Sequence, residues 1–128
     1  MNRWRDWWAQ AQRDHRHAQH ALEDEDHEWA AFAAQQAAEK ALEALIQSRS
    51  GEPWGHSITA LAEVLPPDIA APADLIEAAS RLDKHYIPAR YPNGFASGYP
   101  GKLYTRAEAQ GAIADAGTIF EFCRRYLP

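Results

Sequence analysis

The sequence contains almost no cysteine and no long apolar segment, and both absences limit what the protein can be. Its single cysteine, Cys123, cannot form an intrachain disulfide, and a four-cysteine zinc site is excluded as well. The longest clearly apolar run, Trp29 to Ala34, is far shorter than the roughly 20 residues that a helix needs to cross a bilayer. The first residues also lack the apolar core of a signal peptide. We therefore expect a cytoplasmic protein with no membrane association.

An excess of positive charge is missing too. The formal net charge is −5, and binding to duplex phosphates requires clustered cations, so we expect no binding to double-stranded DNA. The charges are nevertheless uneven, because residues 21–43 are strongly acidic whereas residues 81–106 carry five basic side chains against one acid. A local basic region on an acidic protein suits a small anionic ligand. The alternative is that these charges only solvate opposite faces or meet across a dimer.

The chain of 128 residues is long enough for one domain, residues 1–128, and its apolar residues recur with the period of a helix. We find no alternating strand pattern, so we predict an all-α, up-and-down bundle of about five helices. The expected helices are residues 2–22, residues 27–47, a short helix capped by Ser57, a helix from about Pro72, and a last helix that opens at the capping-box sequence Thr105-Arg106-Ala107-Glu108.

A long loop is expected before the last helix, over residues 88–104. It is rich in glycine, proline and tyrosine, and loops of this length in compact domains are commonly functional or mobile.

The second helix is the most informative segment. Thirteen of the eighteen residues from Trp29 to Ile46 are apolar, which is typical of a helix at the centre of a bundle. Its polar residues fall within one arc of roughly 140°, since successive residues are about 100° apart. This stripe is either a solvent-facing strip or one wall of a polar cleft. Its members are Gln35, Gln36, Glu39, Lys40 and Glu43.

Three cationic side chains are our candidates for an anion site. Lys40 lies on the polar stripe, His56 precedes the third helix, where free backbone amides favour an anion, and Arg90 opens the long aromatic loop. Aromatic side chains that can stack on a base are Tyr86, Tyr91 and Tyr104. The alternative is structural: Lys40 pairs with an acid, His56 caps a turn, and Arg90 ties the loop down.

No metal or other cofactor is expected. His15, His17 and His20 lie close together on the first helix, but no two of them have the i, i+4 spacing that points two ligands the same way. His17 and His20 are three residues apart, and no third ligand accompanies them.

Three sequence motifs in order resemble the HEPN domain family. The first is Phe32-Ala-Ala-Gln-Gln-Ala-Ala-Glu-Lys-Ala-Leu-Glu-Ala-Leu45, the second is the turn at His56-Ser57-Ile58, and the third is Tyr86-Ile-Pro-Ala-Arg90-Tyr91-Pro92. The resemblance covers nearly the whole chain. It implies a helical bundle that dimerises and that either binds nucleotides or pairs with a small nucleotidyltransferase, in some cases within a toxin–antitoxin system.

Other members of the family that this chain resembles are ribonucleases with an Arg followed, after four to six residues, by a His. Arg49 and His56 have this spacing, as do Arg13 and His20, but roughly one such pair is expected by chance. In the ribonuclease branch the pair lies near the final helices, and this sequence has no His after Arg90. We therefore expect no ribonuclease activity, and we favour a non-enzymatic role over an enzymatic one. If the chain is a ribonuclease, Arg49 and His56 are the catalytic candidates. A second alternative is that the protein is a purely structural dimeric scaffold.

A homodimer is the first testable expectation. The tryptophan-rich first helix and the last helix, which contains Gly111 and Gly117, carry more apolar and close-packing surface than one small bundle hides, so either can form the interface. Light scattering at micromolar concentration is expected to give twice the chain mass, and a monomer mass would refute the prediction.

Overall fold

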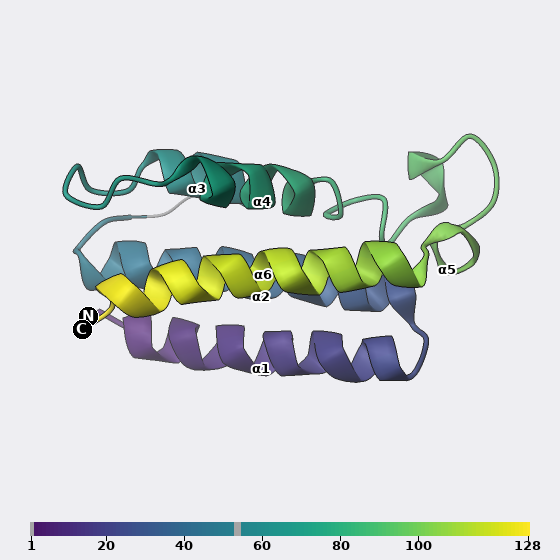
Figure 1. Ribbon diagram of the computed structural model, residues 1–128, viewed down its shortest axis with the longest axis horizontal. Coiled ribbons are helices and arrows are strands. Elements are labelled where there is room, and N and C mark those ends of the chain that lie inside the picture. Colours follow the sequence, from purple (N-terminus) through teal and green to yellow (C-terminus); the bar gives the residue numbers. More distant parts are fainter. Residues whose placement is uncertain (1, 53–54) are drawn as a thin grey trace.

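The computed structural model describes residues 2–52 and 55–128, and every element in this part of the chain is helical. Four helices have eleven residues or more, and they run alternately in opposite directions (Figure 1). The helices are α1 (Trp4–Glu23), α2 (His27–Ser48), α3 (Ile58–Glu63), α4 (Ala73–Asp83), α5 (Pro100–Leu103) and α6 (Arg106–Tyr126), with a 3₁₀ turn η1 (Pro92–Gly94) before α5. This confirms the predicted all-α bundle.

Helix α2 occupies the centre, between α1 on one side and α6 on another, while α3 and α4 form a further layer (Figure 1). The two termini meet at one end of the bundle, and the segment that carries α5 projects at the opposite end (Figure 1). Eight alanines of α2 are buried, and their small side chains allow the neighbouring helix backbones to approach closely. They are Ala30, Ala31, Ala33, Ala34, Ala37, Ala38, Ala41 and Ala44.

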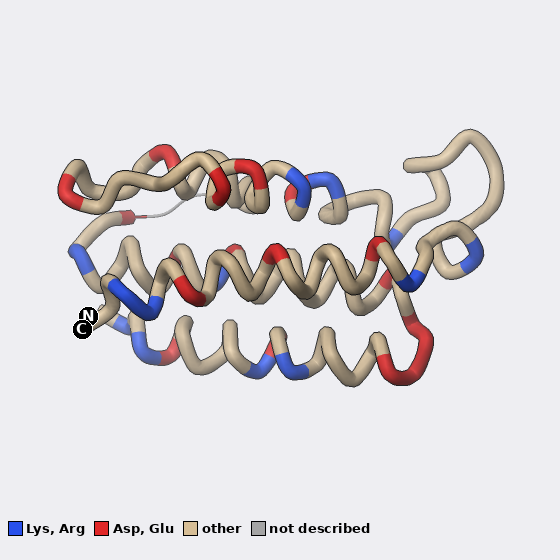
Figure 2. The backbone as a smooth tube through the Cα atoms, viewed as in Figure 1, with Lys and Arg blue, Asp and Glu red and all other residues tan. Residues whose placement is uncertain are grey.

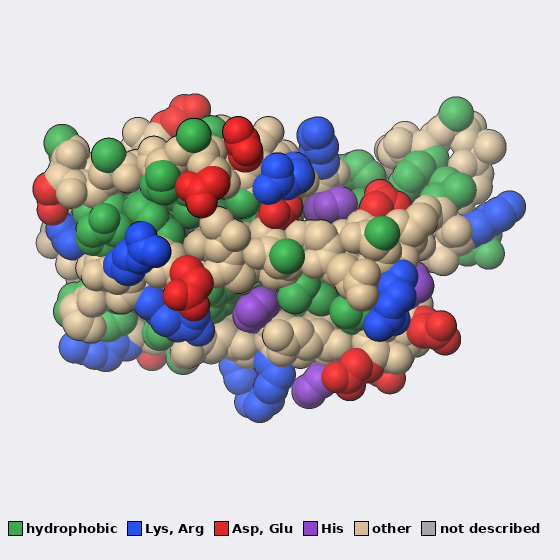
Figure 3. All heavy atoms as spheres, viewed as in Figure 1, with side chains coloured by type: hydrophobic (Ala, Val, Ile, Leu, Met, Phe, Trp, Pro, Cys, Tyr) green, Lys and Arg blue, Asp and Glu red, His purple; other side chains and the backbone are tan. Residues whose placement is uncertain are grey.

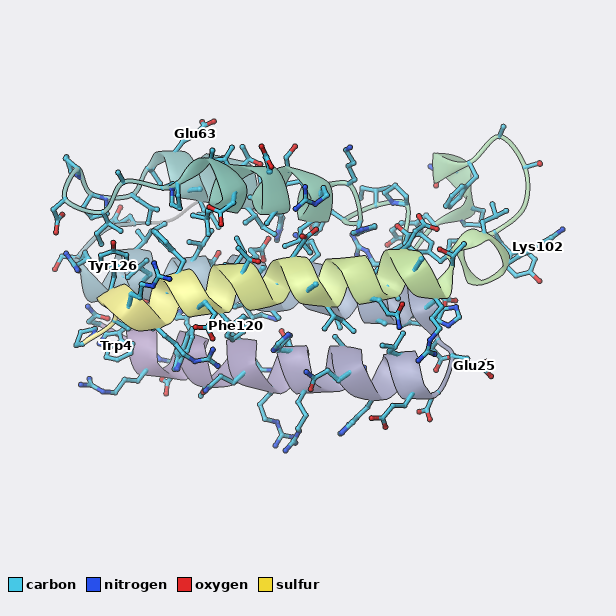
Figure 4. The ribbon with its side chains drawn as sticks, in the orientation of Figure 1. Trp4, Glu25, Glu63, Lys102, Phe120 and Tyr126 are labelled. Carbon is cyan, nitrogen blue, oxygen red and sulfur yellow. The ribbon has the colours of Figure 1, made fainter. Side chains whose placement is uncertain are left out.

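The tryptophan stripe of α1 is used inside the bundle. The ring of Trp8 packs on Phe120 of α6 with 5.1 Å between centroids, and the ring of His15 stacks on the same Phe120 at 4.8 Å. Phe120 accordingly lies on the side of α6 that faces α1 (Figure 4). Much of the apolar surface that suggested a dimer interface on α1 is therefore covered by the chain itself.

The turns follow the local chemistry of the sequence. Helix α2 ends in a Schellman motif, in which Gly51 donates to the carbonyl of Ile46 and Ser50 donates to that of Gln47. The predicted cap of α3 is confirmed, since the Ser57 hydroxyl accepts from the backbone of Ala60. The predicted capping box of α6 is confirmed as well. The acidic run at residues 23–26 lies at the turn between α1 and α2 (Figure 2).

Two local expectations differ from the structure. Helical periodicity predicts that the buried face of the fourth helix continues to Tyr86 and Ile87, but α4 ends at Asp83 and Ile87 is exposed. A methyl group added at Gly111 or Gly117 would meet no atom within 4 Å, so neither glycine makes a close helix contact with the part of the chain that the structure describes. Contacts of these glycines with a second copy stay a prediction.

Asp83 holds α3 against α4. Its Oδ1 accepts from the backbone N–H of Ile58 at 2.7 Å, while its Oδ2 accepts from the N–H of Thr59 and from the hydroxyl of Ser57, both at 3.1 Å. These amides belong to the first turn of α3, which has no intrahelical acceptors for them. A carboxylate there satisfies them and also interacts favourably with the helix dipole.

We expect Asp83→Ala to lower the free energy of unfolding by roughly 2 kcal/mol or more, because it leaves buried amides without an acceptor. Urea unfolding followed by circular dichroism measures the change. The matched control is Asp68→Ala, which removes a surface ion pair with Arg49 and is expected to cost less than about 1 kcal/mol. Equal losses in the two variants would contradict the role given to Asp83.

Candidate functional site

Three of the five residues in the polar stripe of α2 are buried. Gln35, Glu39 and Glu43, each four residues from the next, are only 0, 4 and 8% exposed. Gln36 and Lys40 lie beside them and are half-buried. The stripe is therefore not a solvent-facing strip. Burial of its polar groups costs free energy unless groups from other elements form hydrogen bonds with them.

His56 is the main residue that contacts the buried row of Gln35, Glu39 and Glu43. The side-chain amide of Gln35 donates to the backbone carbonyl of His56 at 3.2 Å, and the imidazole Nδ1 lies 3.0 Å from Oε1 of Glu39. The imidazole also stacks on the ring of Tyr86, with 4.7 Å between centroids and an 18° interplanar angle. Because the side chain is still 58% exposed, its Nε2 is the nitrogen available to a ligand.

Arg90 is held next to His56 by aromatic rings. Its guanidinium carbon lies 4.5 Å from the ring centroid of Phe32, 4.6 Å from that of Tyr86 and 5.1 Å from that of Tyr91. Its Nε donates to the carbonyl of Tyr86 at 2.9 Å. His56 and Arg90 thus share the ring of Tyr86 as a common support.

Among the described residues, no acidic side chain lies beside the charge of Arg90. Within residues 2–52 and 55–128, no carboxylate comes within ion-pair distance of its guanidinium. The aromatic faces stabilise the cation without neutralising it, and the two terminal nitrogens keep their hydrogen-bond donors. An anion is the partner that such a group accepts most readily.

Two predicted site residues lie elsewhere. The ammonium of Lys40 forms an ion pair with Asp14 of α1, so Lys40 points toward α1 and not toward His56. The hydroxyl of Tyr104 is buried and bonds Nδ1 of His85 at 2.7 Å, where it joins the last loop to the end of α4. The remaining four predicted residues, His56, Tyr86, Arg90 and Tyr91, are brought together.

The ribonuclease candidates are separated. Arg49 binds Asp68 at 2.8 Å and the carbonyl of Tyr126 at 3.3 Å, at the C-terminal end of α2. The imidazole of His56 lies at Glu39, ten residues earlier on α2, which is roughly 15 Å along the helix axis. One phosphate group cannot contact both side chains in this arrangement.

Phe32 and Asp83 are contributors that sequence reasoning missed. Phe32 precedes Gln35 by three residues and Glu39 by seven, so the three side chains share one face of α2. The spacing predicts this shared face, but it does not predict that Arg90 packs on Phe32. The bonds of Asp83 to α3 depend on the packing of two helices, and no local pattern predicts them.

Burial also raises the pKa values of the two acidic side chains in this row, Glu39 and Glu43. Burial raises the pKa of Glu39, and His56 opposes the shift. Burial, with the negative charge of Glu39 as the next cause, raises the pKa of Glu43 to about 7, and Oε2 of Glu43 has no hydrogen-bond partner among the described residues. Two buried carboxyl groups one helical turn apart therefore hold fewer than two negative charges at neutral pH.

Comparison with known protein families and with solved structures identifies one family. The HEPN domain model matches residues 4–126. The chain belongs to the HEPN domain family. Its fold is similar to that of TT1696 from Thermus thermophilus, which is 50% identical with a TM-score of 0.97 over 99% of this chain and 100% of that one.

Two further solved structures support the assignment of the HEPN fold. The archaeal HEPN homologue ST0689 is 38% identical, with a TM-score of 0.83 over 98% of each chain. A HEPN domain protein from Thermotoga maritima, tm0613, is 33% identical, with a TM-score of 0.76 over 94% of this chain and 95% of that one. No curated protein matches the sequence significantly.

Membrane spans and metal clusters are both absent from the described residues. No helix in this part of the HEPN chain is long and apolar enough to cross a membrane. No three His, Cys, Asp or Glu side chains within it lie close enough to hold a metal ion.

The raised pKa of Glu43 predicts a pH-dependent stability. The native state keeps a proton on Glu43 that the unfolded chain releases above about pH 4.5, so the contribution of this group falls as pH rises from about 4.5 to 7. We expect Glu43→Gln to raise the free energy of unfolding by up to about 3 kcal/mol at pH 8 and to change it little at pH 4.

Urea unfolding of both proteins across this pH range measures the effect. Burial lowers the pKa values of His15 and His85, which act in the opposite direction, and the difference between variant and parent removes their contribution. The control is Glu63→Gln on the exposed face of α3. A constant difference between Glu43→Gln and the parent at all pH values would contradict the assignment.

Proposed function

We propose that this HEPN protein binds the phosphate groups of a nucleotide at Arg90 and His56. The observation that carries the proposal is the guanidinium of Arg90, fixed by three aromatic rings with no carboxylate partner among the described residues. An oriented imidazole lies on the same Tyr86 ring. Charge-assisted hydrogen bonds from these groups to phosphate are worth roughly 1.5–3 kcal/mol each.

The size of the charged site favours a small ligand. The chain is acidic overall, and the site at Tyr86 offers one guanidinium and one imidazole from the described residues, so a long polyanion gains little from it. Tyr91 is 48% exposed beside the guanidinium, and its ring offers an accessible face next to the bound phosphates. A nucleotide combines the two features that this surface recognises.

A second candidate function is that of a helical partner of a small nucleotidyltransferase, in a toxin–antitoxin-like setting. The observation in its favour is that Trp29, Ile87 and Tyr91 are all 44–50% exposed, and that Trp29 and Tyr91 adjoin one aromatic cluster. Trp29 extends the cluster around Arg90 through Phe32, and Tyr91 lies directly against the guanidinium. A nucleotidyltransferase gene next to this one, and co-purification of the two products, would support this candidate.

Ribonuclease activity is the least favoured alternative, because Arg49 and His56 are held apart. Purified protein is expected to leave RNA intact. Cleavage that His56→Ala abolishes would favour the ribonuclease alternative.

Calorimetric titration with a nucleoside triphosphate tests the proposed site. We expect measurable binding to the parent protein and about tenfold or greater weakening in Arg90→Ala, since one charge-assisted contact is lost. Arg90→Lys keeps the charge but loses the planar stacking, and an intermediate affinity is expected.

The matched control is Arg125→Ala, which removes an exposed arginine near the end of α6. Its affinity is expected to equal that of the parent. Binding that Arg90→Ala leaves unchanged would place the ligand elsewhere, and an absence of binding would reject the proposed function.

A further inference from the structure

A cleft of about 280 Å³ lies between α1 and α2, next to the proposed phosphate site. The side chains of Trp29 and Phe32 form its aromatic walls. Its polar lining residues are Asp14, His17, Gln36 and Lys40. Trp29 stands nearly perpendicular to Phe32, with an 81° interplanar angle and 6.2 Å between centroids. Because Trp29 is 50% exposed, part of its indole surface is free to contact a ligand.

Phe32 connects the cleft to the cation. The same ring that lines the cleft lies 4.5 Å from the guanidinium carbon of Arg90. The cleft and the proposed phosphate site are therefore separated by the width of one aromatic side chain. A ligand with an anionic end and a flat apolar end can reach both.

The polar groups of the cleft suit the edge of a base. The amide nitrogen of Gln36 donates to Oε1 of Gln35, which orients the Gln36 side chain and leaves its own Oε1 as an acceptor. Lys40 has three donor hydrogens, and its ion pair with Asp14 holds the ammonium at the rim of the cleft. The acceptor on Gln36 and the donors on Lys40, whose ion-pair partner Asp14 also lines the cleft, lie beside two aromatic rings. They match the hydrogen-bonding edge and the flat face of a nucleobase.

We infer that this cleft is a nucleobase subsite, in which the base of a nucleotide stacks on Trp29 while its phosphates lie at Arg90. The inference rests on the proposed function and extends it from an anion to a specific class of ligand. It also gives Lys40 a role on the base, at a position distinct from the phosphate site.

Titration with ATP and with inorganic tripolyphosphate separates the two subsites. The full chain is expected to bind ATP about tenfold more tightly than tripolyphosphate, since base stacking on an aromatic side chain adds affinity that is independent of charge. Trp29→Ala is expected to remove this difference and to leave tripolyphosphate binding unchanged. Because Trp29 is half exposed, its removal is expected to preserve the fold, and circular dichroism verifies the helical content.

The matched control is Tyr99→Ala, which removes a 57% exposed aromatic side chain that does not line the cleft. Its preference for ATP is expected to persist. Equal affinities of ATP and tripolyphosphate for the parent protein would overturn the base subsite and leave the phosphate site standing.

If neither ligand binds, the proposed function fails, and the cleft is tested alone with adenosine at millimolar concentration. A shift of the Trp29 indole N–H resonance, assigned by its absence from Trp29→Phe, would support the base subsite without the phosphate site. No shift would overturn both.

Discussion

The burial of α2 on nearly every side is the constraint on which the rest of this HEPN structure depends. Its alanines contact both α1 and α6, and close helix approach leaves little room for a longer side chain at those positions. Three polar residues of the helix are nevertheless buried with it. An unpaired buried polar group costs roughly 1–3 kcal/mol, which favours a partner from another element. Gln35 and Glu39 have such a partner in His56, whereas Oε2 of Glu43 has none among the described residues.

That preference explains how His56 is placed. Gln35 binds its backbone carbonyl, Glu39 binds its ring, and Asp83 fixes the helix that starts two residues later. Tyr86 follows α4 and supports both His56 and Arg90. The candidate site is therefore assembled on the polar side of the central helix by segments that precede α3 and follow α4. In the space-filling view, hydrophobic side chains gather over the neighbouring segment that carries α5 (Figure 3).

Local features of the fold could be predicted from the sequence because they depend on residues close together in the chain. Helical periodicity placed the long helices within a few residues, and the Thr105–Glu108 box and the Ser57 cap were correctly identified. The central position of α2 followed from its composition. The motifs around residues 32–45, 56–58 and 86–92 identified the family, which the family model and the solved structures confirm.

The sequence by itself determined the helices, their caps, the family and the residue types of the site. Only the tertiary structure decided which of those residues meet. Lys40 lies one residue from Glu39, yet one points toward α1 and the other toward His56, since neighbours on a helix are about 100° apart. Arg90 packs on Phe32, and Asp83 accepts hydrogen bonds from α3, although in each case the partners are too far apart in the sequence for a local pattern to predict the contact. Such pairings arise from helix packing, which brings together side chains that the chain order keeps apart.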